Sequence, residues 1–140
     1  MLLHIVARGR IGRSPEGELV ERYLKRLPWP TRVSELPDVG GKMPDAPPQT
    51  RIVLLDERGE VLSSTEFAAR LERWRDLGMR EARFLIGAAD GFGEAERRDA
   101  DLLLSFGRAT WPHMLARAML AEQLYRATTI LAGHPYHREG

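Results

Sequence analysis

Short apolar segments alternate along this chain with amphipathic segments of helical period, and this alternation restricts the fold more than any other feature. Strand character is seen at 2–8, 31–37, 51–59 and 82–87. Helix character is seen at 14–27, 63–78 and 112–133, with a short helix and the start of a last strand within 93–105. Apolar strands separated by helices predict an α/β fold with a mainly parallel sheet and helices on both faces.

Local signals identify the helix at 63–78 and the two segments that precede it, 38–50 and 51–59. Ser63 or Ser64, together with Glu66, forms a capping box. We expect one buried face on this helix, made of Phe67, Leu71, Trp74 and Leu77. Residues 38–50 are rich in glycine and proline and are predicted to form a loop, whereas 51–59 is expected to be a fully buried strand.

Length and composition limit what the chain can be. Its 140 residues are expected to form one domain, 1–140. The absence of cysteine excludes a disulfide framework and a thiolate metal site. The apolar run at the start is too short for a signal peptide, and no segment reaches the roughly 20 apolar residues of a membrane span. We therefore expect a soluble, cytoplasmic protein with no membrane partner.

The charge leaves nucleic-acid binding open. The net charge is only +1, without the basic excess of many nucleic-acid binders. Yet 19 of the 21 basic residues are arginine, which suits phosphate and base-edge recognition better than lysine. A GC-rich genome explains the same bias and is the favoured explanation.

The longest predicted helix, 112–133, is opened by Pro112, closed by Gly133 and apolar over most of its circumference. Its apolar residues include Leu115, Ala116, Ala118, Met119, Leu120, Ala121, Leu124, Ala127, Ile130 and Leu131. Such a helix must be covered on more than one side, and a small domain offers one sheet for one side. We therefore predict a homodimer through this helix. The alternative is complete burial within one chain.

Three strand ends are expected to meet at one edge of the sheet. Leu55 and Asp56, in the stretch 54–59, close one strand. Gly87 follows another strand, and 105–114 connects the last strand to the longest helix. Ligands bind at this edge in parallel sheets, so the convergence indicates a site. Phe106 and Trp111 could flank an adenine-like ring there. The alternative is a set of ordinary turns with Trp111 in the core.

Polar groups on and after the longest helix are further candidates. Glu122 and Arg126 are four residues apart, so they form a surface ion pair or point into a wet site at the dimer seam. Three histidines could offer nitrogen ligands to a metal: His113, His134 and His137. No fixed helical spacing holds the last two together and no cysteine is available, so no metal site is predicted.

Four stretches carry a resemblance that covers nearly the whole chain and is weakest at 38–50. They are PHMLARAMLAEQLYRA (112–127), HPYHRE (134–139), LDERGEVLSSTEFAARLERW (55–74) and FLIGAADGF (84–92). The first two closely match the C-terminal signature of the bacterial large-subunit ribosomal RNA pseudouridine N3-methyltransferases. These are the smallest members of the trefoil-knotted SPOUT methyltransferases. The other two stretches resemble that family's middle segment and its glycine-rich cofactor loop.

The resemblance implies a deep C-terminal trefoil knot, with knot and cofactor loops at about 84–140, that binds S-adenosylmethionine. The residues implied to bind this cofactor are Leu55, Gly87, Phe106, Gly107, Arg108, Ala109, Thr110 and Trp111. It also implies dimerisation through the knot region. The implied substrate is a pseudouridine in helix 69 of 23S rRNA, within the assembled ribosome.

The residues implied to act on that substrate are Glu122, Arg126, Tyr136, His137, Arg138 and His113. The site must align N3 with the methyl group and stabilise the developing anion, a task that suits Arg126 and Arg138. Glu122 or a histidine could accept the proton directly or through water, unless positioning alone suffices. The tail of Tyr136, His137 and Arg138 is expected to be a substrate clamp, ordered against the neighbouring subunit and its cofactor.

The chain departs from the family at three places. Ala88, Ala89 and Asp90 replace a pattern of two glycines, a proline and a glutamate, and Arg108 stands where a small or apolar residue is usual. Residues 38–50 are shorter than the matching segment, which ordinarily holds a helix. Two alternatives follow: a non-catalytic ribosome- or RNA-binding dimer that has lost its cofactor, or a knotted methyltransferase that acts on another RNA base.

Overall fold

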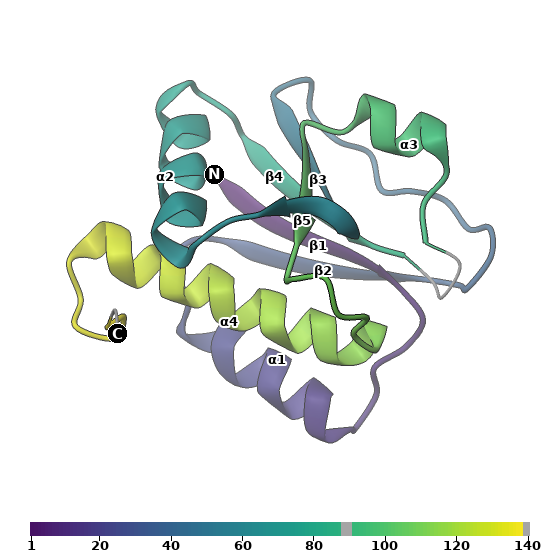
Figure 1. Cartoon of the computed structure of the whole chain (residues 1–140), viewed down its shortest axis with the longest axis horizontal. Coiled ribbons are helices and arrows are strands. Elements are labelled where there is room, and N and C mark those ends of the chain that lie inside the picture. The colour runs from purple at the N-terminus through teal and green to yellow at the C-terminus, as the bar shows by residue number, and fades with distance from the viewer. Residues whose placement is uncertain (88–90, 139–140) are drawn as a thin grey trace.

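The computed structural model describes residues 1–87 and 91–138. Helices and strands alternate through these residues, as the sequence predicts, except that the second and third strands follow one another with no helix between them (Figure 1). In chain order the elements are β1 (Leu2–Arg8), α1 (Pro15–Arg26), β2 (Thr31–Leu36), β3 (Thr50–Val61), α2 (Ser64–Asp76), β4 (Glu81–Ile86), α3 (Glu94–Asp99), β5 (Leu102–Ser105) and α4 (His113–Ala132).

The five strands form one sheet in the order β2-β1-β4-β3-β5, and every pair of neighbours is parallel. The predicted parallel sheet is therefore confirmed. β5 follows β4 in the chain but pairs with β3, so the chain crosses β3 to reach the sheet edge. The middle of β3 and the carboxyl ends of β4 and β5 consequently lie together. The predicted convergence is confirmed for β4 and β5, but the expectation that a strand closes at Leu55 is wrong, because β3 continues to Val61.

Both faces of the sheet are covered, but unequally. Apolar side chains on one face, such as Ile5 and Phe84, pack against α2 and α4, and α1 packs against α4 in turn. On the opposite face Leu54 and Leu85 pack against Phe92 and Ala100, which flank α3. Helices on both faces are confirmed, with the three longer ones gathered on one side.

A buried polar network holds the segment before β3 against the opposite face. Arg83 of β4 donates from Nε to Glu81 over 2.6 Å, and its two Nη atoms donate to the backbone oxygens of Pro44 and Asp45. Glu81 also contacts His4 over 3.1 Å, and these three side chains are almost fully buried. The predicted loop before β3 is confirmed. Arg83 ties this loop to the sheet at the place where the matching family segment ordinarily holds a helix.

Two expectations about burial are wrong. Leu77 is 57% exposed because it is the capping residue that follows the last residue of α2, whereas Ala68 completes the buried face beside Phe67. β3 is longer than predicted, and only Val53 and Leu54 in it are buried. Its second half passes beyond β4 and pairs with β5 alone, after a register shift between Leu55 and Glu60.

α4 is covered on two sides and partly exposed on a third. Leu120 and Leu124 belong to the main core, and Ala118 and Ala121 pack against α1. The side made of Leu115, Met119, Glu122 and Arg126 remains only partly buried. Complete burial of this helix within one chain is therefore wrong, and the predicted dimer stays a prediction. Within the described residues, no helix is long and apolar enough to cross a membrane.

Candidate active site

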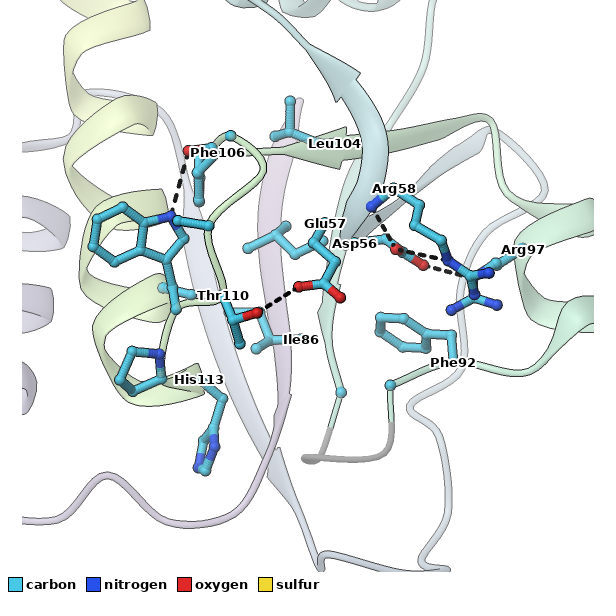
Figure 2. Close-up of a pocket in the computed structure, with 18 residues that line it drawn as sticks. Asp56, Glu57, Arg58, Ile86, Phe92, Arg97, Leu104, Phe106, Thr110 and His113 are labelled. Carbon is cyan, nitrogen blue, oxygen red and sulfur yellow. Dashed lines mark hydrogen bonds and ion pairs between the residues drawn. The ribbon is translucent and has the colours of Figure 1, made fainter.

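A cavity of about 850 Å³ opens at the carboxyl edge of the sheet, between β3, β4, the segment after β5 and the start of α4 (Figure 2). Ligand sites commonly have volumes of roughly 300–1,000 Å³. The residues that line the cavity are Leu55, Asp56, Glu57, Arg58, Ile86, Gly87, Gly91, Phe92, Arg97, Leu104, Phe106, Gly107, Ala109, Thr110, Trp111, Pro112, His113 and Ala116.

The cavity brings together most of the residues that the resemblance assigns to the cofactor. Those that line it are Leu55, Gly87, Phe106, Gly107, Ala109, Thr110 and Trp111, whereas Arg108 does not. Trp111 is 43% exposed, so its placement in the core, the alternative interpretation, is wrong. The replacements at 88–90 lie outside the described residues. Cofactor binding by the lining residues stays a prediction.

Glycines allow the backbone to border the cavity closely. A Cβ on Gly87 would lie 3.2 Å from the Phe92 ring, which is tighter than ordinary van der Waals contact. Gly107 has a φ of +113°, a conformation that side-chain-bearing residues rarely adopt. Ser105 Oγ accepts from the Gly107 N–H over 3.1 Å and so holds the first turn of the connection to α4.

Asp56 and Arg97 join β3 to α3 on one side of the cavity. Arg97 Nε donates to Asp56 Oδ2 over 2.5 Å, and the backbone N–H of Arg58 donates to Asp56 Oδ1 over 2.9 Å. Burial raises the pKa of Asp56, but these hydrogen bonds and the two arginine charges outweigh burial and lower the pKa below its usual value. Asp56 is therefore an ionised anchor in the neutral pH range.

Glu57 and Thr110 join β3 to the segment before α4 on the other side of the cavity. The Thr110 hydroxyl donates to Glu57 Oε2 over 3.0 Å. Figure 2 shows the Glu57 side chain pointing into the cavity toward Thr110, away from the cluster of Asp56, Arg58 and Arg97. The sequence analysis assigns no role to Glu57 or Arg97. Glu57 lies in the candidate stretch 54–59, but no local pattern shows that its side chain meets Thr110 or that Arg97 reaches Asp56.

The tail packs on α4 of its own chain. The Tyr136 ring lies 4.8 Å from the Tyr125 ring between centroids, and the Arg126 guanidinium lies 4.8 Å from the Tyr136 centroid. Arg126 Nη1 is 3.1 Å from His137 Nδ1, and Arg126 Nε donates to Glu122 over 2.6 Å. Four of the six residues assigned to the substrate thus form one cluster, and Arg138 follows it directly.

His113, the last of the six residues assigned to the substrate, lies at the other end of α4, where it lines the cavity. α4 has 20 residues, and a helix of that length spans about 30 Å. Figure 1 shows the tail and the segment before α4 at opposite ends of this helix. His113 therefore cannot share a metal ion with His134 and His137 of the same chain. In the described ranges, no group of three or more His, Asp or Glu side chains could hold a metal ion.

Comparison with known proteins identifies the family. The family model described as "Predicted SPOUT methyltransferase" matches residues 1–137. The chain belongs to the SPOUT methyltransferases. The all-parallel sheet, with β5 placed beyond β3, is consistent with the α/β knot fold predicted from the sequence.

Individual relatives agree with this assignment. The chain is 72% identical over 140 residues to "Ribosomal RNA large subunit methyltransferase H" of Rhizorhabdus wittichii, with all of both chains covered. It is 63% identical over 142 residues to the protein of that name in Zymomonas mobilis, again with full coverage of both. A solved structure of a probable methylase family protein from Haemophilus influenzae shares the fold, with a TM-score of 0.57 and 13% identity over 94% of this chain and 66% of that one.

Proposed function

We propose that this SPOUT methyltransferase methylates large-subunit ribosomal RNA in the cytoplasm, with S-adenosylmethionine as methyl donor. Its full-length relatives at 72% and 63% identity are named as large-subunit rRNA methyltransferases, which supports the substrate class. We assign the reaction to N3 of a pseudouridine in helix 69 of 23S rRNA on the assembled ribosome. The match of 112–127 and 134–139 to the family signature supports this finer assignment.

The cavity at the carboxyl edge is the observation that carries the proposal. Its lining combines two aromatic residues, Phe106 and Trp111, with glycines at which the backbone can approach a ligand. These features suit a nucleoside with an extended polar tail. Leu55, Gly87 and the segment from Phe106 to Trp111 would hold S-adenosylmethionine. When bound, it supplies an electrophilic methyl group attached to a positively charged sulfur.

The arrangement of one chain supports a homodimer with composite sites. The cluster of Arg126, Tyr136 and His137 lies at one end of α4 and the cavity at the other. A single chain therefore does not bring its tail to its own cavity. A second copy placed against the partly exposed side of α4 would bring the tail of one protomer to the cavity of its partner.

The side chains of the tail cluster suit the handling of a pseudouridine. Methylation would replace the N3–H bond with an N3–methyl bond, while the donor's sulfur–methyl bond breaks and leaves a neutral thioether. The site would therefore have to accept one proton and stabilise negative charge on the base. Arg126 and the exposed Arg138 would supply positive charge. Burial and the neighbouring Tyr23 raise the pKa of Tyr136 to about 12, so its phenol donates hydrogen bonds and does not act as the base. Glu122 and His137 remain the candidate proton acceptors.

The first experiment incubates the purified protein with labelled S-adenosylmethionine and ribosomes from cells that lack this modification. The RNA is then digested, and the methylated nucleoside is located by mass spectrometry. Label on one pseudouridine of helix 69 is expected. Label on another base would retain the methyltransferase and overturn the substrate assignment. No label, together with no cofactor binding in calorimetry, would favour the non-catalytic RNA-binding dimer.

A complementation experiment tests the composite site. One variant combines Tyr136→Ala with Arg138→Ala, and the other carries Gly107→Val in the cofactor segment. Each is expected to be inactive alone, whereas mixed dimers regain activity because one of their two sites is intact. Failure of the mixture, with heterodimers demonstrated by native mass spectrometry, would contradict the composite arrangement.

A further inference from the structure

Glu57 has a position in the cavity that the candidate cofactor residues do not explain. It lies in β3, three residues after the buried Leu54, and its side chain is exposed and borders the cavity. Figure 2 shows its carboxylate directed toward Thr110, in a cavity also lined by Ile86 and Phe92. The Glu57 carboxylate accepts a hydrogen bond from the Thr110 hydroxyl, over 3.0 Å.

Charge is unevenly distributed around the cavity. Asp56 is neutralised by Arg97 at 2.5 Å and is also 3.9 Å from Arg58. Glu57, by contrast, takes part in no ion pair among the described residues. Its hydrogen-bond partner is the neutral hydroxyl of Thr110. One side of the cavity thus carries a carboxylate shared by two arginines, and the other carries a carboxylate whose negative charge is not compensated.

We propose that Glu57 is a specificity-determining residue that makes the cavity prefer the positively charged methyl donor over its neutral product. This inference rests on the proposed use of S-adenosylmethionine. The donor has a sulfonium charge that S-adenosylhomocysteine lacks, while both carry the same ammonium, carboxylate and adenosine groups. An uncompensated carboxylate in the cavity therefore attracts the donor more strongly than the product. The preference favours product release after each transfer.

Glu57 also has a possible structural role, which the test must separate from the charge effect. Its hydrogen bond to Thr110 connects β3 to the segment before α4 and could simply hold that segment in place. Glu57→Gln keeps an oxygen that can accept from Thr110 but removes the charge. Thr110→Val keeps the charge but removes the hydrogen bond. Glu57→Gln therefore tests the charge, and Thr110→Val tests the hydrogen bond.

The experiment measures dissociation constants for S-adenosylmethionine and S-adenosylhomocysteine by titration calorimetry, at one low ionic strength. The quantity compared is the ratio of the product's constant to the donor's. Glu57→Gln is expected to lower this ratio about three- to tenfold, the size of a Coulomb effect in a partly solvated site. Thr110→Val is expected to weaken both ligands while the ratio stays near that of the wild type.

A matched control is Glu60→Gln, which removes the same charge from the same strand. Glu60 does not line the cavity, and its ion pair with Arg70 is a long 3.7 Å. The ratio should not change in this variant. In the wild-type protein, the ratio should also fall as salt is added, because ions screen the carboxylate. This measurement does not depend on the folding of any variant.

The outcomes separate the inference from the proposed function. An unchanged ratio in Glu57→Gln, with both ligands bound, overturns the role of Glu57 and leaves the cofactor assignment intact. A ratio that does not respond to salt also counts against it. If the wild-type protein binds neither ligand, the cofactor assignment fails, and the inference fails with it.

Discussion

Arg117 of α4 donates from Nη1 to Glu35 Oε2 of β2 over 2.5 Å, although 82 positions separate the two residues. Arg117 is only 1% exposed, and its Nη2 also donates to the Gly9 oxygen. Glu35 accepts a further hydrogen bond from the Ile11 N–H over 2.8 Å. Burial raises the pKa of Glu35, but Arg117 and Ile11 outweigh burial and lower the pKa below its usual value. The pair thus fastens the segment after β1 to the beginning of α4.

Replacing Arg117 should therefore destabilise the fold. Arg117→Met is expected to lower the free energy of unfolding by about 2–4 kcal/mol, because Glu35 loses its partner and α4 loses its link to the segment after β1. Urea denaturation would measure this. Glu35→Gln should also be destabilising, since it leaves a buried guanidinium without its counter-charge. The double variant should lose less than the sum of the two, and strict additivity would show that the pair is not coupled.

Gly59→Ala should be among the most damaging single substitutions. A Cβ on Gly59 would lie 2.5 Å from the carbonyl carbon and oxygen of Leu103, so β3 and β5 would have to separate. We expect a loss of about 3 kcal/mol or more in the free energy of unfolding. Gly40→Ala is the matched control, because Gly40 has a φ of +76° but open space around it. Gly40→Ala should lower the free energy of unfolding by about 1–2 kcal/mol, because of its backbone conformation alone. Equal losses in thermal or urea denaturation would contradict the steric explanation.

The stability of the protein should decrease in mild acid because of His4. Burial lowers the pKa of His4 below 6.5, although its hydrogen bond to Glu81 opposes the effect. Above pH 6.5 the imidazole is neutral in both the folded and the unfolded chain, so it contributes no pH dependence. Below that value the unfolded chain takes up a proton that the folded chain binds less readily, and the free energy of unfolding falls until the folded pKa is passed.

Urea denaturation at about pH 7.5 and about pH 5.5 would measure the loss, and NMR would follow the His4 ring directly. Protonation of the folded His4 at or above its ordinary pKa would contradict this prediction. Three acidic residues have lowered pKa values: Glu35, Asp56 and Glu66. They act only at lower pH, because stabilisation from such groups is lost below their unfolded values of 4.5 for the two glutamates and 3.8 for Asp56.

Tyr136 should contribute through its ring and its hydrogen bonding rather than by accepting a proton. Tyr136→Phe keeps the ring against Tyr125 and Arg126, so the methylation rate should fall less than about tenfold. Tyr136→Ala loses the ring contacts, so the methylation rate should fall further than in Tyr136→Phe. Because the pKa of Tyr136 is raised to about 12, the pH–rate profiles of wild type and Tyr136→Phe should have the same shape between about pH 6 and 9. A limb of the wild-type profile that disappears in Tyr136→Phe would assign the proton to Tyr136 after all.

The structure confirms those sequence predictions that depend on local chemistry. Ser63 and Glu66 form both hydrogen bonds of the capping box, at 3.1 and 2.8 Å, because capping is decided within one helical turn. Gly133 ends α4 with a φ of 72°, as a glycine after a helix commonly does. The connection at 105–114 borders the cavity, as expected from the rule that ligand sites lie where parallel strands end. The individual residues from Phe106 to Trp111 were implied by the resemblance, and all but Arg108 line the cavity.

By itself, the sequence determined the helices, the strands, the parallel sheet and the edge at which a site forms, because periodicity, caps and strand direction are properties of neighbouring residues. Only the tertiary structure decided that Leu77 is exposed, that β3 extends past β4, and that the tail packs on its own α4. It also decided the pairing of Asp56 with Arg97 and the direction of Glu57. These outcomes depend on strand order and on contacts between residues far apart in the chain, and no local pattern specifies which distant segment will lie alongside.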